Sequence, residues 1–166
     1  MLDPIVDKLT RSIEEAANGR ILNTEISRAT STDLAALAPG WRFDWGQELP
    51  HHEVYKLTVG QHGGLIHGLI SLGRQPGFVL VNLLESNPIN VGRDKQYVGV
   101  PGNLFAYAAR LSFELGHEGF VVFVAKSALI THYEQSLGAR RIGSSQRMFL
   151  DTSAATRLVT LYFGGD

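Results

Sequence analysis

The chain has 166 residues, of which 44% are hydrophobic and 19% charged, and its formal net charge at pH 7 is −1. This composition excludes a disordered chain and favours one folded domain, 1–166. Cysteine is absent, which excludes disulfides, cysteine–zinc sites and a thiol nucleophile, and fits the reducing cytoplasm where we expect the protein to act. No basic run is present, so no nucleic-acid partner is expected.

Membrane and metal partners are not expected either. No window approaches the ~18 apolar residues of a membrane span. The first 18 residues carry acids and lack the apolar core of a signal peptide. None of the six histidines stands in a metal-ligand spacing, so no metal is assigned.

The N-terminal fifty residues begin with a predicted helix from about Pro4 to Asn18. Asp3 suits its N-cap, and Gly19 can end it. An apolar residue recurs at helical spacing along it, at Ile5, Leu9, Ile13 and Ala16.

A strand over Arg20–Ile26 should follow this helix. A short helix opened by Ser31 or Thr32 should then run to Leu37. The aromatic segment Trp41–Leu49 fits either an edge strand or a loop, and the sequence does not decide between them.

Three strand-like runs come next, at Val54–Val59, Leu65–Leu72 and Phe78–Leu84. The turns between them, Gly60–Gly64 and Gly73–Gly77, are short and rich in glycine, which predicts antiparallel hairpins and therefore a meander. The third run is almost continuously apolar, as expected of a central strand buried on both faces.

The pattern changes after this meander. A polar loop over Glu85–Tyr97 leads into a predicted helix over Pro101–Leu115 and a short apolar strand, Phe120–Val124. This order predicts a βαβ unit in which Phe78–Leu84 and Phe120–Val124 run parallel.

The C-terminal part should hold two more helices and a strand. Ser127 is expected to cap a helix that ends at Gly138, Arg147–Leu150 reads as a strand, and Thr152 or Ser153 should open the last helix.

The segment most informative about function joins the polar loop to the helix. It reads Gln96-Tyr97-Val98-Gly99-Val100-Pro101-Gly102-Asn103-Leu104. The first turn of a helix carries free N–H groups and partial positive charge, and glycines let a diphosphate approach them. A glycine-rich turn that merely feeds an ordinary helix is the competing interpretation.

Two nucleotide-binding templates do not fit this segment. A Walker motif needs Gly-Lys-Ser/Thr at the helix start, which is absent. A Rossmann fingerprint needs a parallel sheet from its first strand and a different glycine spacing.

Together, the order of elements and these residues resemble the GNAT superfamily of N-acetyltransferases. Its Gln/Arg-x-x-Gly-x-Gly/Ala segment is matched by Gln96-x-x-Gly99-x-Pro101, and the run Tyr133–Ala139 resembles the end of the family's fourth helix. The similarity covers about Val54–Leu150. Pro101 departs from the pattern, because it removes one N–H donor.

The resemblance implies a mixed α/β sheet, an antiparallel meander followed by a βαβ unit, with helices on both faces. It also implies acetyl-CoA as co-substrate, lying in a V-shaped cleft between Phe78–Leu84 and Phe120–Val124. Backbone groups of two strand residues would pair with the pantetheine arm, and those of the helix start would hold the diphosphate. The implied cofactor-binding residues are Leu83, Leu84, Gln96, Val98, Gly99, Val100, Gly102 and Asn103.

Three side chains each allow two interpretations. Tyr133 would protonate the departing thiolate in the family, or it packs its ring on the helix. Glu85 would be the general base that deprotonates the amine, or an exposed glutamate at a strand end. Asn82 hydrogen-bonds a neighbour, or marks the strand bulge seen in the family.

The sequence thus predicts acetyl transfer from acetyl-CoA to a small-molecule or peptide amine, by direct attack with both reactants bound. A homodimer is a further expectation, because members of the family often dimerise. The competing hypothesis is a non-catalytic acyl-CoA-binding or protein-interaction module that shares the fold.

Overall fold

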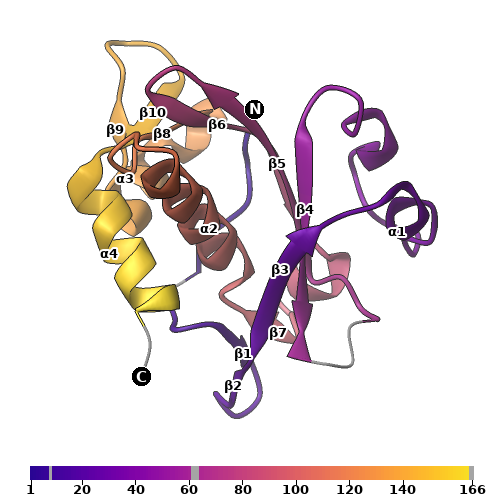
Figure 1. Cartoon of the computed structure of the whole chain (residues 1–166). Coiled ribbons are helices and arrows are strands. Elements are labelled where there is room, and N and C mark those ends of the chain that lie inside the picture. The colour runs from indigo at the N-terminus through magenta and orange to yellow at the C-terminus, as the bar shows by residue number, and fades with distance from the viewer. Residues whose placement is uncertain (8, 61–63, 165–166) are drawn as a thin grey trace.

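The computed structural model describes residues 1–7, 9–60 and 64–164. Its main element is a seven-stranded mixed sheet with the order β3-β4-β5-β6-β8-β10-β9 (Figure 1). The bounds of these strands are β3 Thr24–Arg28, β4 Glu53–Val59, β5 Gly68–Gln75, β6 Phe78–Ser86, β8 Val121–Val124, β9 Arg140–Arg141 and β10 Arg147–Leu150. A smaller sheet joins β1 Ile13–Glu15, β2 Ile21–Leu22 and β7 Tyr97–Val98.

The predicted meander and βαβ unit are both present. Strands β3 to β6 pair antiparallel in sequence order, and β6 then pairs parallel with β8. The chain crosses from β6 to β8 through α2, Val100–Glu114. The predicted turn Gly60–Gly64 lies largely outside the described residues. Strand β5 begins and ends three residues later than Leu65–Leu72, because Arg74 and Gln75 extend the ladder to Val79 and Phe78.

Helices lie on both faces of the sheet. Helix α2, α3 (Ile130–Leu137) and α4 (Thr152–Phe163) pack on the larger core, where the rings of Phe105, Phe123 and Tyr133 meet. The opposite face of β4 and β5 carries Val54 and Leu69, and a second core with Leu34 and Trp45 covers it. Leu34 comes from α1, Ser31–Ala35, which stands on the far side of the sheet from α2 (Figure 1).

The helix predicted over Pro4–Asn18 is wrong, because no described residue in this range is helical. The spacing of Ile5 and Leu9 suggested a helix, yet the backbone here bonds to distant parts of the chain. Leu2 pairs with Ala125, and the Val6 and Thr10 N–H groups donate to side chains of α3 and α4. These tertiary contacts outweigh the weak local preference.

Smaller corrections concern the ends of elements. Asn23 divides the strand predicted over Arg20–Ile26 into β2 and β3. The N-cap of α1 is Thr30, which forms a capping box with Asp33. Ser127 caps no helix with its side chain. The segment Trp41–Leu49 is a loop with a short 3₁₀ turn, and within the described residues no helix is long and apolar enough to cross a membrane.

Candidate functional site

Strands β6 and β8 separate in the middle of the sheet, as the resemblance implied. Their parallel pairing covers Val79–Val81 on β6 and ends there. Past this point the edge of β8 bonds to the N-terminus of the chain: Leu2 N–H donates to Val124 O over 2.6 Å, and Lys126 N–H donates to Leu2 O over 2.9 Å. We call residues 1–7 and 9–12 the N-terminal strap. The strap therefore occupies the β8 side of the split.

A bulge in β6 lies beside this split. Ser71 of β5 stands opposite Leu83 and Leu72 opposite Val81, so Asn82 is the extra residue. Its side-chain amide donates to Glu48 Oε1 over 2.8 Å, which means that both interpretations of Asn82 hold. The bulge turns the Leu83 N–H to the Ser71 hydroxyl over 3.0 Å. Leu84 follows, fully buried, on the part of β6 that has left β8.

The start of α2 is covered by the chain itself. Gly99 is the N-cap, with φ +97°, a backbone conformation that favours glycine. A Cβ on Gly99 would collide with the Thr10 hydroxyl and the Ser12 carbonyl, and one on Gly102 would collide with the Tyr162 hydroxyl. These glycines therefore permit close approach of the strap and α4, where the sequence suggested approach of a diphosphate.

The other predicted diphosphate residues lie around this covered helix start. Val100 and Asn103 are each 1% exposed. The Asn103 side-chain amide donates to Thr24 over 3.3 Å, while its buried Oδ1 has no hydrogen-bond partner among the described residues. Val98 pairs with Glu14 of β1, and Gln96 is exposed and bonds through its backbone to Ala16 and Ile89.

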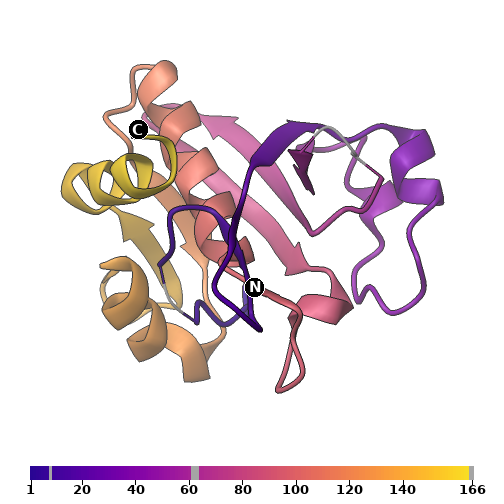
Figure 2. The ribbon, with the colours of Figure 1, turned by 90° about the horizontal axis from the view of Figure 1, so that it is seen from below.

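Tyr133 also contacts the strap. It lies on the buried face of α3, and its hydroxyl donates to Pro4 O over 2.7 Å. Burial raises the pKa of the Tyr133 phenol above its ordinary value, so the hydroxyl holds its proton more tightly. His132, next to Tyr133 in the sequence, accepts the Val6 N–H at Nε2 over 2.9 Å. The strap passes beside α3 (Figure 2).

Glu85 is buried at the end of β6, and three N–H groups donate to its carboxylate. The donors are Arg42 N–H at 2.6 Å, Phe43 N–H at 3.3 Å and the Trp45 indole at 2.9 Å. Glu85 therefore ties the aromatic loop to the central strand.

A cavity of about 450 Å³ lies between the strap and the end of β6. This volume lies within the usual range of small-molecule sites. Its charged lining residues are Asp3, Asp7, Arg42, Glu85 and Lys95. Arg42 pairs with Asp3 over 2.8 Å and Lys95 with Asp7 over 2.6 Å, so both cations at the mouth are bound by strap carboxylates.

Sequence reasoning missed the strap and its partners. Pro4 and Tyr133 are 129 residues apart, and Val6 and His132 are 126 apart, so no local pattern could join them. The described residues hold no group of three or more His, Cys, Asp or Glu side chains arranged for a metal ion.

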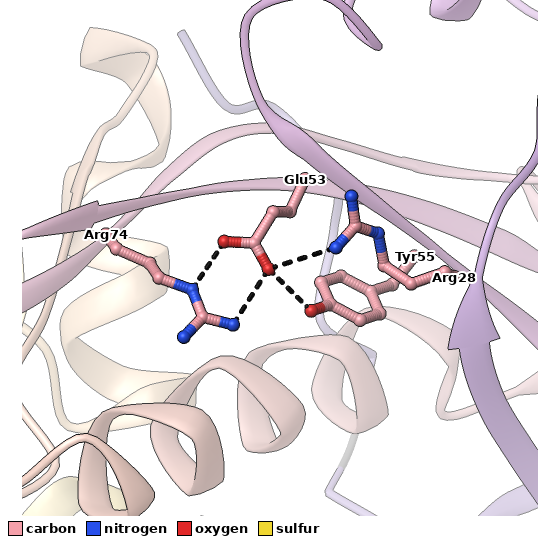
Figure 3. Close-up of polar contacts among 4 residues, drawn as sticks. All are labelled: Arg28, Glu53, Tyr55 and Arg74. Carbon is pink, nitrogen blue, oxygen red and sulfur yellow. Dashed lines mark hydrogen bonds and ion pairs between the residues drawn. The ribbon is translucent and has the colours of Figure 1, made fainter.

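A second polar cluster lies away from the split and serves as a contrast (Figure 3). Glu53 accepts two bonds from Arg74, at 2.5 and 3.0 Å, and one from the Tyr55 hydroxyl at 2.8 Å. Arg28 pairs with the same carboxylate over 3.4 Å. The Arg74 guanidinium holds the pKa of Glu53 below its usual value. The cluster links β3, β4 and β5 and borders no described cavity.

Comparison with known proteins supports the fold. No protein-family model matches the chain, and no curated protein matches it by sequence. Among solved structures, AtaTR bound with AcCoA matches at a TM-score of 0.54 and 16% identity, covering 82% of this chain and 98% of that one. AtaT complexed with acetyl-methionyl-tRNAfMet matches at 0.55 and 14%, covering 82% and 99%. The KacTA–DNA complex matches at 0.55 and 16%, covering 83% and 99%.

These likenesses confirm the expected GNAT-like fold, a mixed sheet with helices on both faces. They also show that excluding a nucleic-acid partner was wrong. Chains of this fold occur in complexes with DNA and with tRNA. A net charge of −1 without a basic run therefore does not exclude such partners, because charge was counted over the whole chain while binding depends on local surface.

Proposed function

We propose that this protein transfers an acetyl group from acetyl-CoA to an amine. The observation that carries the proposal is the separation of β6 and β8 immediately after Val81, beside the bulge at Asn82. A chain of the same fold is known bound with AcCoA. The cavity of about 450 Å³ along Leu84 and Glu85 lies within the usual range of small-molecule sites.

The proposed roles of the residues follow the resemblance. Backbone groups of Leu83 and Leu84 would pair with the pantetheine amides. Main-chain N–H groups around Gly99, Gly102 and Asn103 would hold the diphosphate, flanked by Gln96, Val98 and Val100. Binding donor and amine in one cleft would supply much of the rate by proximity.

Two side chains would handle protons. Tyr133 would donate its hydroxyl proton to the departing thiolate. Glu85 would accept a proton from the attacking amine at the cavity. It already accepts three N–H bonds, so it would act through a remaining lone pair or an ordered water.

The arrangement of the diphosphate site does not fit acetyl-CoA as it stands. Leu9, Thr10 and Tyr162 lie against the helix start that would receive the phosphates. This observation favours the second candidate function, a protein-interaction module on the same fold, in which the covered helix start is permanent.

Thermal unfolding with coenzyme A separates these functions. A ligand that binds the native state at about 100 times its Kd adds ~2.7 kcal/mol, or roughly 5–10 °C for a chain of this size. Such a shift with coenzyme A, and none with ATP or NAD, supports the proposal. No shift at millimolar coenzyme A would contradict it.

Turnover then separates catalysis from binding alone. Release of free coenzyme A from acetyl-CoA should depend on an added amine. The acceptor panel should include small amines, peptides and a methionyl-tRNA, since a structure with acetyl-methionyl-tRNAfMet is among those that match. Binding without turnover across this panel would favour the module.

A further inference from the structure

We propose that the N-terminal strap competes with the acyl donor for the same site. The donor must displace the strap in order to bind. The inference rests on the proposed function and deepens it. The strap covers Tyr133 at one end of the proposed donor site and the start of α2 at the other. The donor and the strap therefore cannot occupy this site together.

The strap is held as an added strand would be. Leu2 bonds through both backbone groups to the edge of β8 that β6 has left. Two residues further on, Pro4 O accepts from Tyr133, and Val6 N–H donates to His132. These contacts use the β8 edge and the α3 side chains on one side of the split.

The strap has buried residues that anchor it and an exposed residue between them. Leu2 is 2% exposed and Val6 is 3% exposed, and both lie in the larger core. Ile5 between them is 50% exposed. Two apolar anchors, two ion pairs and single hydrogen bonds hold the strap, without the continuous ladder of a strand inside the sheet, so the strap can be displaced at moderate cost.

The strap carries negative charges, as does the coenzyme A that it would exclude. Asp3 and Asp7 pair with Arg42 and Lys95 at the mouth of the cavity. When the strap leaves, these two cations become free to bind an anion. Coenzyme A carries phosphates, and so the strap carboxylates and the ligand would compete for the same positive charges.

The need to displace the strap lowers the apparent affinity for coenzyme A. If only a small fraction of molecules is open, the apparent Kd for coenzyme A exceeds the intrinsic value by the inverse of that fraction. Substitutions that weaken the strap should therefore tighten coenzyme A binding, whereas loss of a ligand contact would weaken it.

The first test changes one anchor of the strap and one matched control outside it. Val6→Ser removes a buried apolar side chain, and we expect about tenfold tighter binding of coenzyme A by calorimetry. Ile142→Ser makes a comparable change at an exposed position outside both the strap and the cavity, and should leave the Kd within twofold. Equal or weaker binding by a folded V6S protein would overturn the proposal.

The second test locks the strap in place. The chain has no cysteine, so Leu2→Cys with Ala125→Cys creates a single thiol pair. Residues paired across a β-bridge lie within the usual reach of a disulfide. The oxidised double variant should lose coenzyme A binding at least tenfold, and reduction should restore it. Each single variant, treated with the same oxidant, should bind in both states.

The outcomes separate this inference from the proposed function. Equal binding by the oxidised and reduced forms would show that coenzyme A does not displace the strap, and would leave the acetyltransferase proposal standing. No binding by wild type, V6S or the reduced double variant, with all three folded by circular dichroism, would overturn both.

Discussion

The edge of β8 that faces β6 has two halves, and they differ in which segment pairs with them. In the first half, Val79–Val81 pairs directly with Val121–Phe123. In the second half, β6 has turned away, and Leu2, more than 120 residues distant in the chain, takes the place beside Ala125. The first half is a strand pair built from two apolar runs. The second is an edge covered by the strap, and it is where we propose that the acyl donor binds.

The largest effect on stability should come from the paired half. Phe123→Ala removes a ring that is fully buried between Phe105 and Tyr133, so we expect a loss of about 3–5 kcal/mol in the free energy of unfolding. Urea denaturation measures this. Val6→Ala at the buried anchor of the strap should cost less, about 1–2 kcal/mol. Comparable losses would mean that the strap is as integral as the sheet.

Tyr133→Phe tests whether the half in which β6 and β8 separate is the site of the chemistry. Removing the proposed acid should lower kcat by about 100-fold or more, while the lost bond to Pro4 costs ~1 kcal/mol of stability. Tyr162→Phe is the matched control, since it removes a hydroxyl that accepts the Thr10 N–H of the strap. If both variants kept or lost activity equally, Tyr133 would have no role in proton transfer.

Glu85→Gln tests the carboxylate that borders the cavity. The amide keeps one acceptor oxygen and presents an NH₂ group to another donor, which should cost about 1–3 kcal/mol of stability. Because a carboxamide cannot accept the amine proton, the rise of kcat/KM with pH should also change shape. Trp45→Phe removes one donor but keeps the carboxylate, so kcat/KM should still rise with pH in this variant.

His67 provides a pH-dependent test of the buried side of β5. It is 3% exposed and contacts Asn90 and Tyr97, and burial lowers its pKa. Below about pH 6.5 the unfolded chain takes up a proton that the folded chain does not bind. Stability should therefore fall as pH drops from 7 to 5.5, by at most ~1.4 kcal/mol per pH unit. The fall should be smaller in His67→Gln by denaturant titration; the same slope in both proteins would contradict this.

The smallest effect is expected at the Glu53 cluster. Arg74→Ala breaks an ion pair whose cation is about half exposed, so the loss should stay below about 1 kcal/mol and shrink in high salt. Coenzyme A binding should be unchanged. A change in that Kd would mean that the cluster communicates with the split.

The sequence was sufficient for the parts of this fold that are local. The apolar runs Phe78–Leu84 and Phe120–Val124, with the helix between them, predicted the parallel pair, and the short glycine turns predicted the meander. The bulge at Asn82 came from the resemblance. The helix over Pro4–Asn18 was mispredicted because Val6 and Thr10 gain their partners only after the chain has folded.

The candidate site, like the fold, could be predicted only in part from the sequence. The glycines at Gly99 and Gly102 marked a place where something approaches the backbone closely, and the structure shows such an approach. Composition could not reveal that the approaching atoms belong to residues 9–12 of the same chain and to Tyr162. The roles of Tyr133, Glu85 and the helix start in binding and catalysis stay predictions.

The most direct test of the account is amide hydrogen exchange with and without saturating coenzyme A. The Leu2 and Val6 N–H groups donate to Val124 O and His132 Nε2, so they should exchange slowly in the free protein. We expect coenzyme A to speed exchange at both amides, while Val81 in the paired half stays protected. If coenzyme A binds and both strap amides stay as slow as before, the groove that the strap fills is not the donor site.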